Sequence, residues 1–218
     1  MPKKILLTGF EPFNCESVNP AWEAVQALAG WRTATFEVVA IQLPCIFGQA
    51  HLVLAAAIER TAPSVIIAVG QAGGRSEICV ERVAINIDDA PIPDNAQNQP
   101  VDRTIVAGAP AAYFSSLPIK AIAQAIRARG IPASVSQTAG TFVCNHVFYA
   151  LMHHLASGGA VSSARGGFIH VPYLPQQAAG HPGQPSMALA TIIEGLRTAI
   201  IVSAKDAPDL RVAEGRID

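Results

Sequence analysis

The sequence predicts a single-domain α/β protein, an α/β/α sandwich around a twisted, mostly parallel sheet. First, short apolar runs rich in β-branched residues alternate with runs of helical periodicity along most of the 218 residues. Second, half of the residues are hydrophobic and only 14% are charged, as expected where a sheet is buried on both faces. Third, the length suffices for one large core and is short for two. We therefore expect one domain over residues 1–204 and a flexible polar tail over residues 205–218.

Each element is predicted from its apolar spacing and from the residues that end it. The apolar run 64–70 predicts a buried strand, because a strand covered on both faces need not alternate. Asn19 is a suitable N-cap for a helix with Pro20 in its first turn, and Gly30 ends that helix. The expected strands cover residues 4–10, 36–43, 64–70, 80–89, 133–137 and 167–172. The expected helices cover residues 20–29, 47–61, 118–128, 145–156 and a final segment capped by Ser186.

Three segments are less regular. Residues 80–89 alternate between polar and apolar side chains, which predicts a strand with one wet face near a sheet edge. Residues 89–110 are rich in proline, asparagine and aspartate and predict a long loop, as do residues 175–185.

Composition argues against several classes of partner. The formal net charge is −1 and there is no basic cluster, so we expect neither nucleic acid nor an anionic membrane as partner. The four cysteines form no C-x-x-C pair and no zinc-ligand spacing, so we expect no metal and no cofactor. The apolar segment 4–10 lacks a cleavage site, and no apolar run is long enough to cross a bilayer. These features predict a cytoplasmic protein with free thiols.

The segment 138–149 carries the first candidate for chemistry. A glycine-bearing turn leads from a strand into a helix and places Cys144 at or near the first helical turn. The free N–H groups there and the helix dipole favour a thiolate, the reactive form of cysteine. A buried structural cysteine is the alternative interpretation.

A cysteine nucleophile needs a base, and the base needs a group that orients it. His170 ends a short buried strand where a loop begins. Glu81 interrupts an apolar run, and an inward carboxylate there needs a partner, either a histidine or one of Arg75 and Arg82. Because strand ends gather at one edge of a parallel sheet, we expect residues 9–10, residues 70–71, Cys144 and His170 to share a site. The other histidines are assigned to surfaces, subunit contacts or loops: His51, His153, His154 and His181.

Several long motifs resemble the pyroglutamyl peptidase I (pyrrolidone-carboxylate peptidase) family of cysteine peptidases. The resemblance runs from the N-terminus to about residue 204. The matching blocks are residues 6–13 (LLTGFEPF), 19–25 (NPAWEAV), 69–75 (VGQAGGR), 81–86 (ERVAIN), 92–95 (IPDN), 139–146 (AGTFVCNH) and 167–172 (GFIHVP).

The resemblance implies a hydrolase, a cysteine-type omega peptidase that removes an N-terminal pyroglutamyl residue through a thioacyl-enzyme. It implies Cys144 as nucleophile, His170 as base and Glu81 as the orienting acid. A flat, neutral lactam suits apolar walls and a few hydrogen bonds. The resemblance implies a homotetramer as well. The family's pocket maps onto the apolar Phe10, Phe13, Ile92, Phe142 and Val143, with Asn19 and Gln71 as polar contacts.

Two positions depart from the family pattern. Asn14-Cys15 stands where the family has a glycine pair, and we expect a reshaped loop because Cys15 tolerates a left-handed backbone poorly. Pro91 stands where an arginine is common, which removes any contribution of that arginine to the rate.

Two other functions remain open at this stage. Residues 70–75 (GQAGGR) could bind phosphate in an enzyme similar to nucleoside phosphorylases, although they lack a complete P-loop or dinucleotide motif. A tight turn whose backbone approaches a small ligand is the better interpretation of that segment. The other possibility is a binding protein with a vestigial triad.

Overall fold

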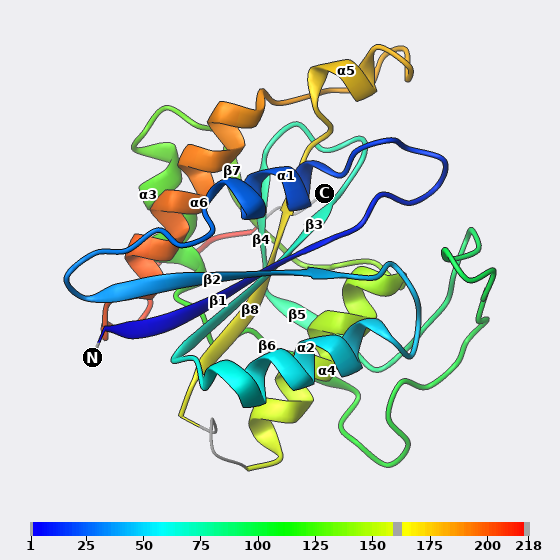
Figure 1. Cartoon of the computed structure of the whole chain (residues 1–218), viewed down its shortest axis with the longest axis horizontal. Coiled ribbons are helices and arrows are strands. Elements are labelled where there is room, and N and C mark those ends of the chain that lie inside the picture. Colours follow the sequence, from blue (N-terminus) through cyan, green and yellow to red (C-terminus); the bar gives the residue numbers. More distant parts are fainter. Residues whose placement is uncertain (1, 159–162, 216–218) are drawn as a thin grey trace.

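A six-stranded sheet with helices on both faces forms the body of the protein (Figure 1). The computed structural model describes residues 2–158 and 163–215. The strand order is β2 (Phe36–Leu43), β1 (Lys3–Phe10), β3 (Val65–Gln71), β8 (Arg165–Val171), β4 (Ile78–Glu81) and β7 (Ala133–Ser136). All neighbouring strands are parallel except β4 and β8, which are antiparallel. The predicted α/β fold with a mostly parallel sheet is confirmed.

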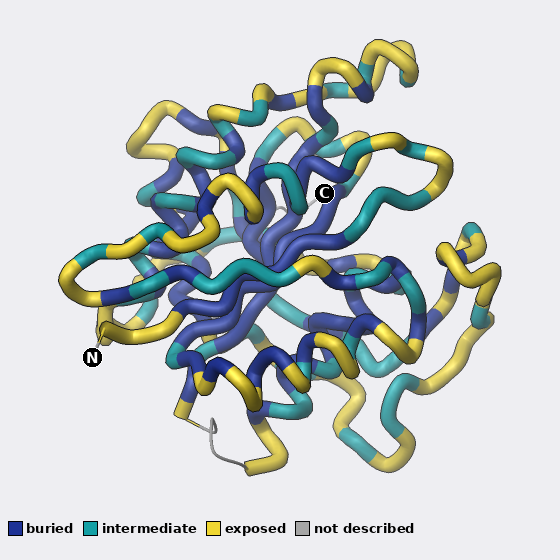
Figure 2. Tube along the Cα trace, viewed as in Figure 1, coloured by how far each residue is buried: buried dark blue, intermediate teal, exposed yellow. Residues whose placement is uncertain are grey.

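The helices divide between the two faces of the sheet. The structure has α1 (Pro20–Ala27), α2 (Ala50–Thr61), α3 (Ile119–Arg127), α4 (Val143–Ala156), the short α5 (Pro175–Ala178) and α6 (Leu189–Ser203). Helices α1, α3 and α6 pack together on one face, and α2 and α4 pack on the other. The strands between these layers are buried, whereas the outer helix surfaces are exposed (Figure 2).

Side-chain alternation along the central strands gives each face its own core. In β1, Ile5 and Leu7 point into the core of α1, α3 and α6, and Leu6 points into the core of α2 and α4. In β3, Val69 belongs to the first core and Ala68 to the second. The face on which a strand-end side chain lies can therefore be inferred from its position in the alternation.

The segment expected as one edge strand over residues 80–89 is instead two strands in different sheets. β4 ends at Glu81, and β5 (Val83–Ile85) pairs antiparallel with β6 (Ala112–Phe114) in a separate two-stranded sheet. β4 lies between β8 and β7, and all four of its residues are buried. The alternation was a correct observation, but the chain changes its pairing partner at Arg82, which the alternation does not reveal.

Other boundaries also shift. Helix α4 begins at Val143, two residues before the expected start. Ala188, not Ser186, occupies the N-cap of α6, and Ser186 forms a β-bridge with Tyr173. The loop expected over residues 175–185 contains α5.

The expected flexible tail lies against the domain over much of its length. Asp209 accepts hydrogen bonds from the backbone N–H groups of Lys120 and Ala121, at the start of α3. Glu214 forms an ion pair with Arg127. Residues 216–218 lie outside the described part of the chain. Among the residues that the structure describes, no helix has both the length and the apolar character needed to span a bilayer.

Candidate active site

Helix α4 presents Cys144 in its first turn. The turn before it passes through Gly140, whose φ of 75° suits a residue without Cβ, and the N-cap Phe142 is extended. No side chain caps this helix, so the N–H groups of its first turn remain available to a ligand. Cys144 is the second residue of the helix and is half-buried. The predicted position of the cysteine is confirmed.

Gly70 provides the floor on which the thiol rests. A Cβ atom at Gly70 would lie 2.7 Å from Cys144 Sγ and 2.8 Å from the Phe168 ring. Only a residue without a side chain leaves room for the sulfur there. In the register of β3 and β8, Gly70 pairs with His170, so the His170 side chain lies on the same face of the sheet, one strand away.

His170 forms a short hydrogen bond with Glu81. Its Nδ1 lies 2.7 Å from Glu81 Oε1, and Glu81 is fully buried. Cys79 pairs with His170 across β4 and β8, and alternation from Cys79 places Glu81 on the same face as the imidazole. Because an ionised carboxylate only accepts hydrogen bonds, Nδ1 carries the proton and Nε2 is left as the basic nitrogen.

Arg75 completes the partners of Glu81. Its Nη1 donates to the same Oε1 atom at 2.7 Å, and its Nη2 donates to the carbonyl of Thr138 at 3.0 Å. Both partners considered for Glu81, a histidine and Arg75, are therefore present. Arg82 instead bonds to Gln137 and to the carbonyl of Glu214.

The side chains of Cys144 and His170 lie on the same face of the sheet beside Gly70, but they are not joined by a direct hydrogen bond. Among the hydrogen bonds of the described residues, none joins the thiol to the imidazole. Catalytic hydrogen bonds are often long in free enzymes and tighten when the substrate binds. The arrangement supplies a thiol, a basic nitrogen and an orienting carboxylate on one face of the sheet.

The electrostatics of the thiol differ from the sequence-based expectation. The pKa of Cys144 is raised to about 12, chiefly by burial and also by the negative charge of Glu81, while the charge of Arg75 acts in the opposite direction. The helix start was expected to favour a thiolate, but desolvation outweighs it. The free protein therefore holds this cysteine as a thiol.

Aromatic side chains surround the approach to Cys144. The rings of Phe13 and Phe142 have centroids 6.0 Å apart, and Phe47 contacts Phe142 edge-on at 5.3 Å. Val143 is fully buried beside them, and Ile92 is half-buried. Phe47 was not among the predicted walls, because its sequence neighbours resemble those of an ordinary helix start.

Three predicted pocket residues have their side chains engaged within the protein. Phe10 is only 2% exposed and packs on Phe168 in the core. Asn19 caps α1 by accepting from Ala21 N at 3.0 Å and donates to the carbonyl of Glu11. Alternation along β3 directs Gln71 to the face opposite Gly70, where its Oε1 accepts from Gln177.

Asn145 was missed by the sequence analysis although it fixes the start of α4. This fully buried side chain accepts from Ile85 N and donates to the carbonyls of Ile85 and Ile87. The side chain of Asn145 thereby forms hydrogen bonds to β5 that a neighbouring strand would otherwise form. A polar residue at a buried helix position was the only available signal.

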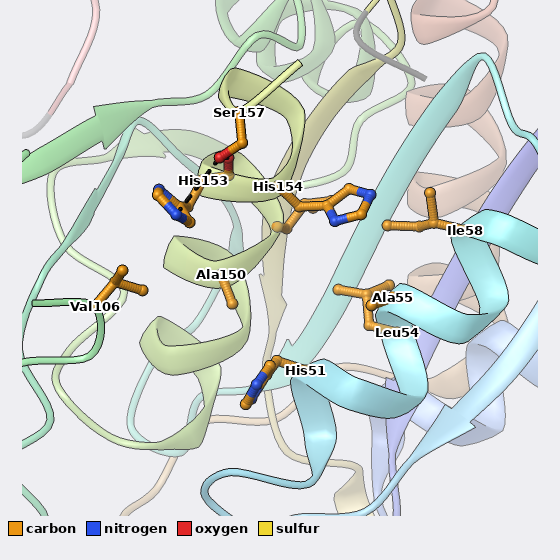
Figure 3. A pocket seen from close by; sticks show the side chains of 10 residues that line it. His51, Leu54, Ala55, Ile58, Val106, Ala150, His153, His154 and Ser157 are labelled. Atoms are coloured by element: carbon orange, nitrogen blue, oxygen red, sulfur yellow. Dashed lines mark hydrogen bonds between the residues drawn. The ribbon is translucent and has the colours of Figure 1, made fainter. Parts of the chain in front are cut away.

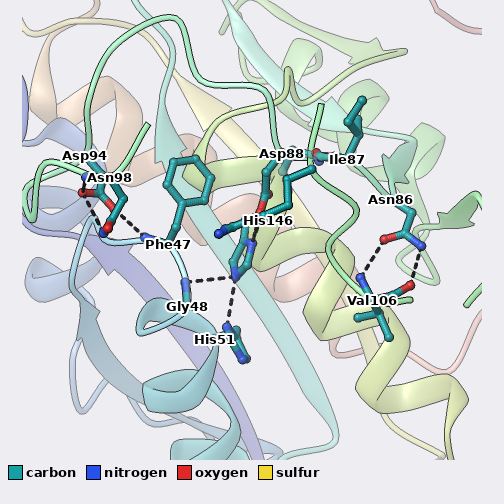
Figure 4. Close-up of polar contacts among 12 residues, drawn as sticks. Phe47, Gly48, His51, Asn86, Ile87, Asp88, Asp94, Asn98, Val106 and His146 are labelled. Atoms are coloured by element: carbon teal, nitrogen blue, oxygen red, sulfur yellow. Dashed lines mark hydrogen bonds and ion pairs between the residues drawn. The ribbon is translucent and has the colours of Figure 1, made fainter. Parts of the chain in front are cut away.

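A buried polar chain fixes the loop that carries Phe47 (Figure 4). Asp88 binds His146 Nδ1 at 3.0 Å, and His146 Nε2 lies 3.0 Å from His51 Nδ1. The backbone N–H of Phe47 donates to Asp94 at 2.8 Å. His51, which was assigned to the helix surface, is half-buried and forms the outer end of this chain.

The loop with the two departures keeps a left-handed backbone at both positions. Asn14 has φ 54° and Cys15 has φ 61°. Cys15 therefore adopts the left-handed conformation that its side chain disfavours, and the expected reshaping of the loop relative to the family stays a prediction. Nearby, a Cβ at Gly73 would collide with the Tyr173 ring, so the glycine-rich turn accommodates this phenol. His181, assigned to a flexible loop, stacks on Tyr173 at 5.0 Å.

A separate cavity of about 280 Å³ lies between α2 and the C-terminal half of α4 (Figure 3). Its lining is mainly aliphatic, with His51, His153 and His154 among the polar groups. It contains none of the predicted site residues. Within the described ranges, no group of His, Cys, Asp and Glu side chains is arranged to hold a metal ion.

Comparison with known proteins agrees with this geometry. The family model described as pyroglutamyl peptidase matches residues 3–206. The pyrrolidone-carboxylate peptidase of Klebsiella pneumoniae is 62% identical over 211 residues, which cover 97% of each chain. That of Cupriavidus taiwanensis is 59% identical over 213 residues, which cover 98% of each chain.

Solved structures give the same result. Pyroglutamyl peptidase I from Bacillus amyloliquefaciens is 48% identical with a TM-score of 0.94, covering 98% of this chain and 100% of that one. A mutant pyrrolidone carboxyl peptidase from Pyrococcus furiosus is 42% identical with a TM-score of 0.89, covering 93% and 99%. The chain belongs to the pyroglutamyl peptidase family.

Proposed function

We propose that this chain hydrolyses the bond after an N-terminal pyroglutamyl residue of peptides, with Cys144, His170 and Glu81 as catalytic triad. The observation that carries the assignment is the 2.7 Å pair of His170 and buried Glu81 on the sheet face where Cys144 rests on Gly70. Family membership supports the substrate class, and the geometry supports the assignment of roles.

The first step forms a thioacyl-enzyme. As Cys144 Sγ attacks the pyroglutamyl carbonyl carbon, its proton passes to His170 Nε2. The carbonyl oxygen gains the negative charge, and N–H groups of the first turn of α4 stabilise it. The carbon–nitrogen bond then breaks, and Nε2 returns the proton to the leaving amine.

The second step releases the product. Nε2 takes a proton from a water molecule, whose oxygen attacks the thioester carbon. The carbon–sulfur bond breaks, the proton returns to the sulfur, and free pyroglutamic acid leaves. Throughout, Glu81 holds the imidazole orientation, and Arg75, which donates to the same carboxylate at 2.7 Å, keeps Glu81 in place.

The high pKa of the thiol fits general-base activation. A group with a pKa of about 12 is protonated at neutral pH, so proton transfer to His170 accompanies the attack. The substrate has no ammonium group, since its amine is closed into a lactam. The aromatic walls around Phe13 and Phe142 suit such a neutral ring better than a charged clamp does.

The test is cleavage of a fluorogenic pyroglutamyl amide under reducing conditions. Wild-type protein cleaves it, a thiol alkylator blocks cleavage, and Cys144→Ala lowers kcat on the order of 10⁴-fold. The matched control is Cys15→Gly, which removes an exposed thiol and suits the left-handed backbone at that position. Absence of wild-type cleavage, or a Cys144→Ala variant with unchanged kcat, contradicts the proposal.

The homotetramer remains a prediction. Sedimentation velocity over a range of protein concentrations measures it directly, and a species of four chains is expected.

A further inference from the structure

Gln177 joins three separate segments at the edge of the candidate site. This residue of α5 is only 5% exposed, although its side chain is polar. Its Oε1 accepts from Leu174 N at 3.0 Å. Its Nε2 lies 3.0 Å from Gln71 Oε1, 3.2 Å from Glu16 Oε2 and 3.3 Å from the carbonyl of Val18. A buried amide with this many partners is costly to disturb.

One of the joined segments, loop 13–18, carries a wall of the pocket. Phe13 faces Phe142 across 6.0 Å at the start of this loop. Asn14 and Cys15 follow in the left-handed region, which is unfavourable for residues with a Cβ. The loop therefore needs contacts from outside itself to keep this shape.

Glu16 provides those contacts and directs them to the region around α5. Its backbone N–H donates to the carbonyl of Phe13 at 3.1 Å, which closes the turn. One carboxylate oxygen accepts from Gln177, and the other lies 2.6 Å from His181 Nε2. The position of Phe13 is thus coupled to Gln177 through a single intervening side chain.

The other joined segments are the fixed part of the site. Gln71 follows Gly70, which supports the thiol, and Leu174 lies shortly after His170 and β8. Gln177 therefore joins loop 13–18, which carries Phe13, to the strands that carry the chemistry. Among the hydrogen bonds of the described residues, none joins Gln177 to Cys144, His170 or Glu81, which lie on the other face of the sheet.

We propose that Gln177 is a positioning residue for the pyroglutamyl pocket, which it keeps closed by holding loop 13–18, and Phe13 with it, against the end of β3. This inference rests on the proposed function. Because the triad is built without Gln177, its loss weakens ring binding and leaves the chemical step intact.

The comparison of Gln177→Leu with Gln176→Leu tests this role. Gln176 is the adjacent residue of α5 and is exposed, so the same substitution there removes no buried contact. For Gln177→Leu we expect KM to rise about tenfold with kcat within about threefold of wild type, whereas Gln176→Leu behaves as wild type. An unchanged KM, or a parallel fall of kcat in Gln177→Leu, overturns the proposal.

A second readout does not depend on turnover. The neutral ring compound 2-pyrrolidone should protect Cys144 from iodoacetamide in a Cys15→Ser background, which removes the exposed thiol and keeps a Cβ at this left-handed position. The concentration needed for half protection is expected to rise about tenfold in Gln177→Leu, while the unprotected alkylation rate is unchanged. If the wild type fails to cleave the reporter, the proposed function fails, whereas this measurement still decides the role of Gln177. If 2-pyrrolidone protects Cys144 equally well with and without Gln177→Leu, the proposed role of Gln177 is overturned.

If Gln177→Leu does not fold, Gln177→Glu keeps the shape and makes the contact pH-dependent. The titratable groups that face this position are Glu16 of the loop, His181 after α5 and Tyr173 after β8. In Gln177→Glu, the new carboxyl donates to Glu16 while it is protonated and repels Glu16 when it is ionised. The negative charge of Glu16 therefore raises the pKa of the new carboxyl, and KM increases as the pH rises through that pKa. A KM profile parallel to that of wild type overturns the proposal.

Discussion

At the scale of single residues, Gly70 has a tightly constrained position beside the thiol. Its Cβ would lie 2.7 Å from the thiol sulfur and 2.8 Å from Phe168, yet its φ is not in the left-handed region. The expected effect of Gly70→Ala is therefore steric alone. We expect kcat/KM to fall about 100-fold, because the sulfur moves from its attack position.

Steady-state kinetics with the fluorogenic amide measures this effect. Gly180→Ala is the matched control, since its Cβ would meet only the Gln177 carbonyl at an ordinary 3.4 Å. Wild-type kinetics in Gly70→Ala would show that the thiol does not depend on this close approach.

The positive charge of Arg75 affects the pKa of Cys144. Burial and Glu81 raise the pKa of the thiol to about 12, and Arg75 lowers it. In the wild type, the alkylation rate of Cys144 should therefore increase with pH from 7 to 10 without a plateau. Arg75→Gln removes the lowering charge, so the pKa rises further and alkylation at pH 9 becomes slower.

The measurement is the iodoacetamide rate against pH in a Cys15→Gly background, so that the exposed thiol does not react. A plateau near neutral pH would show a preformed thiolate. Faster alkylation in Arg75→Gln would show that Arg75 acts through packing and not through its charge.

At the scale of elements, Asn145 joins the nucleophile helix to the small sheet. Its fully buried side chain makes three hydrogen bonds to the backbone of Ile85 and Ile87. Asn145→Ala leaves those backbone groups without a partner, and we expect a loss of about 3 kcal/mol in unfolding free energy. Urea denaturation measures this, with the exposed Gln124→Ala on α3 as control. A loss equal to that of Gln124→Ala would contradict the role of Asn145.

The same scale shows what sequence reasoning could and could not predict. The central strands and the position of Cys144 were predictable, because continuous apolar runs and a glycine turn are local signals. Glu81 was predictable as an inward carboxylate because it interrupts an apolar run. The division of β4 from β5 was not predictable, because it depends on which distant strand each segment pairs with. The chain from Asp88 to His51 escaped notice for the same reason, since its members are far apart in sequence.

At the scale of the whole molecule, the two faces of the sheet perform different tasks. The thiol, imidazole and carboxylate lie on the face of α2 and α4, and the residues that hold the pocket loop lie around α5. The face of α1, α3 and α6 is a continuous apolar core. Changes in α3 on that face should alter stability without altering KM, whereas a change at Gln177, near α5 on the same side, is expected to alter KM.

The C-terminal segment allows a direct test of this separation. Asp209 accepts from Lys120 N and Ala121 N and so caps α3, a helix whose own N-cap residue, Pro118, makes no side-chain hydrogen bond. Asp209→Ala is expected to lower the unfolding free energy by about 1 kcal/mol, the usual value of a lost cap. KM and kcat should stay at wild-type values, because α3 packs on the face opposite the thiol.

Asp206→Ala is the matched control. This aspartate pairs with Lys3, but it is 80% exposed, so water already screens the pair and no measurable loss is expected. Thermal and urea unfolding of the two variants gives the comparison. If both lose the same stability, the segment acts through its charge and not as a cap. If Asp209→Ala also raises KM, then the two faces of the sheet are coupled, and the separation of tasks between them fails.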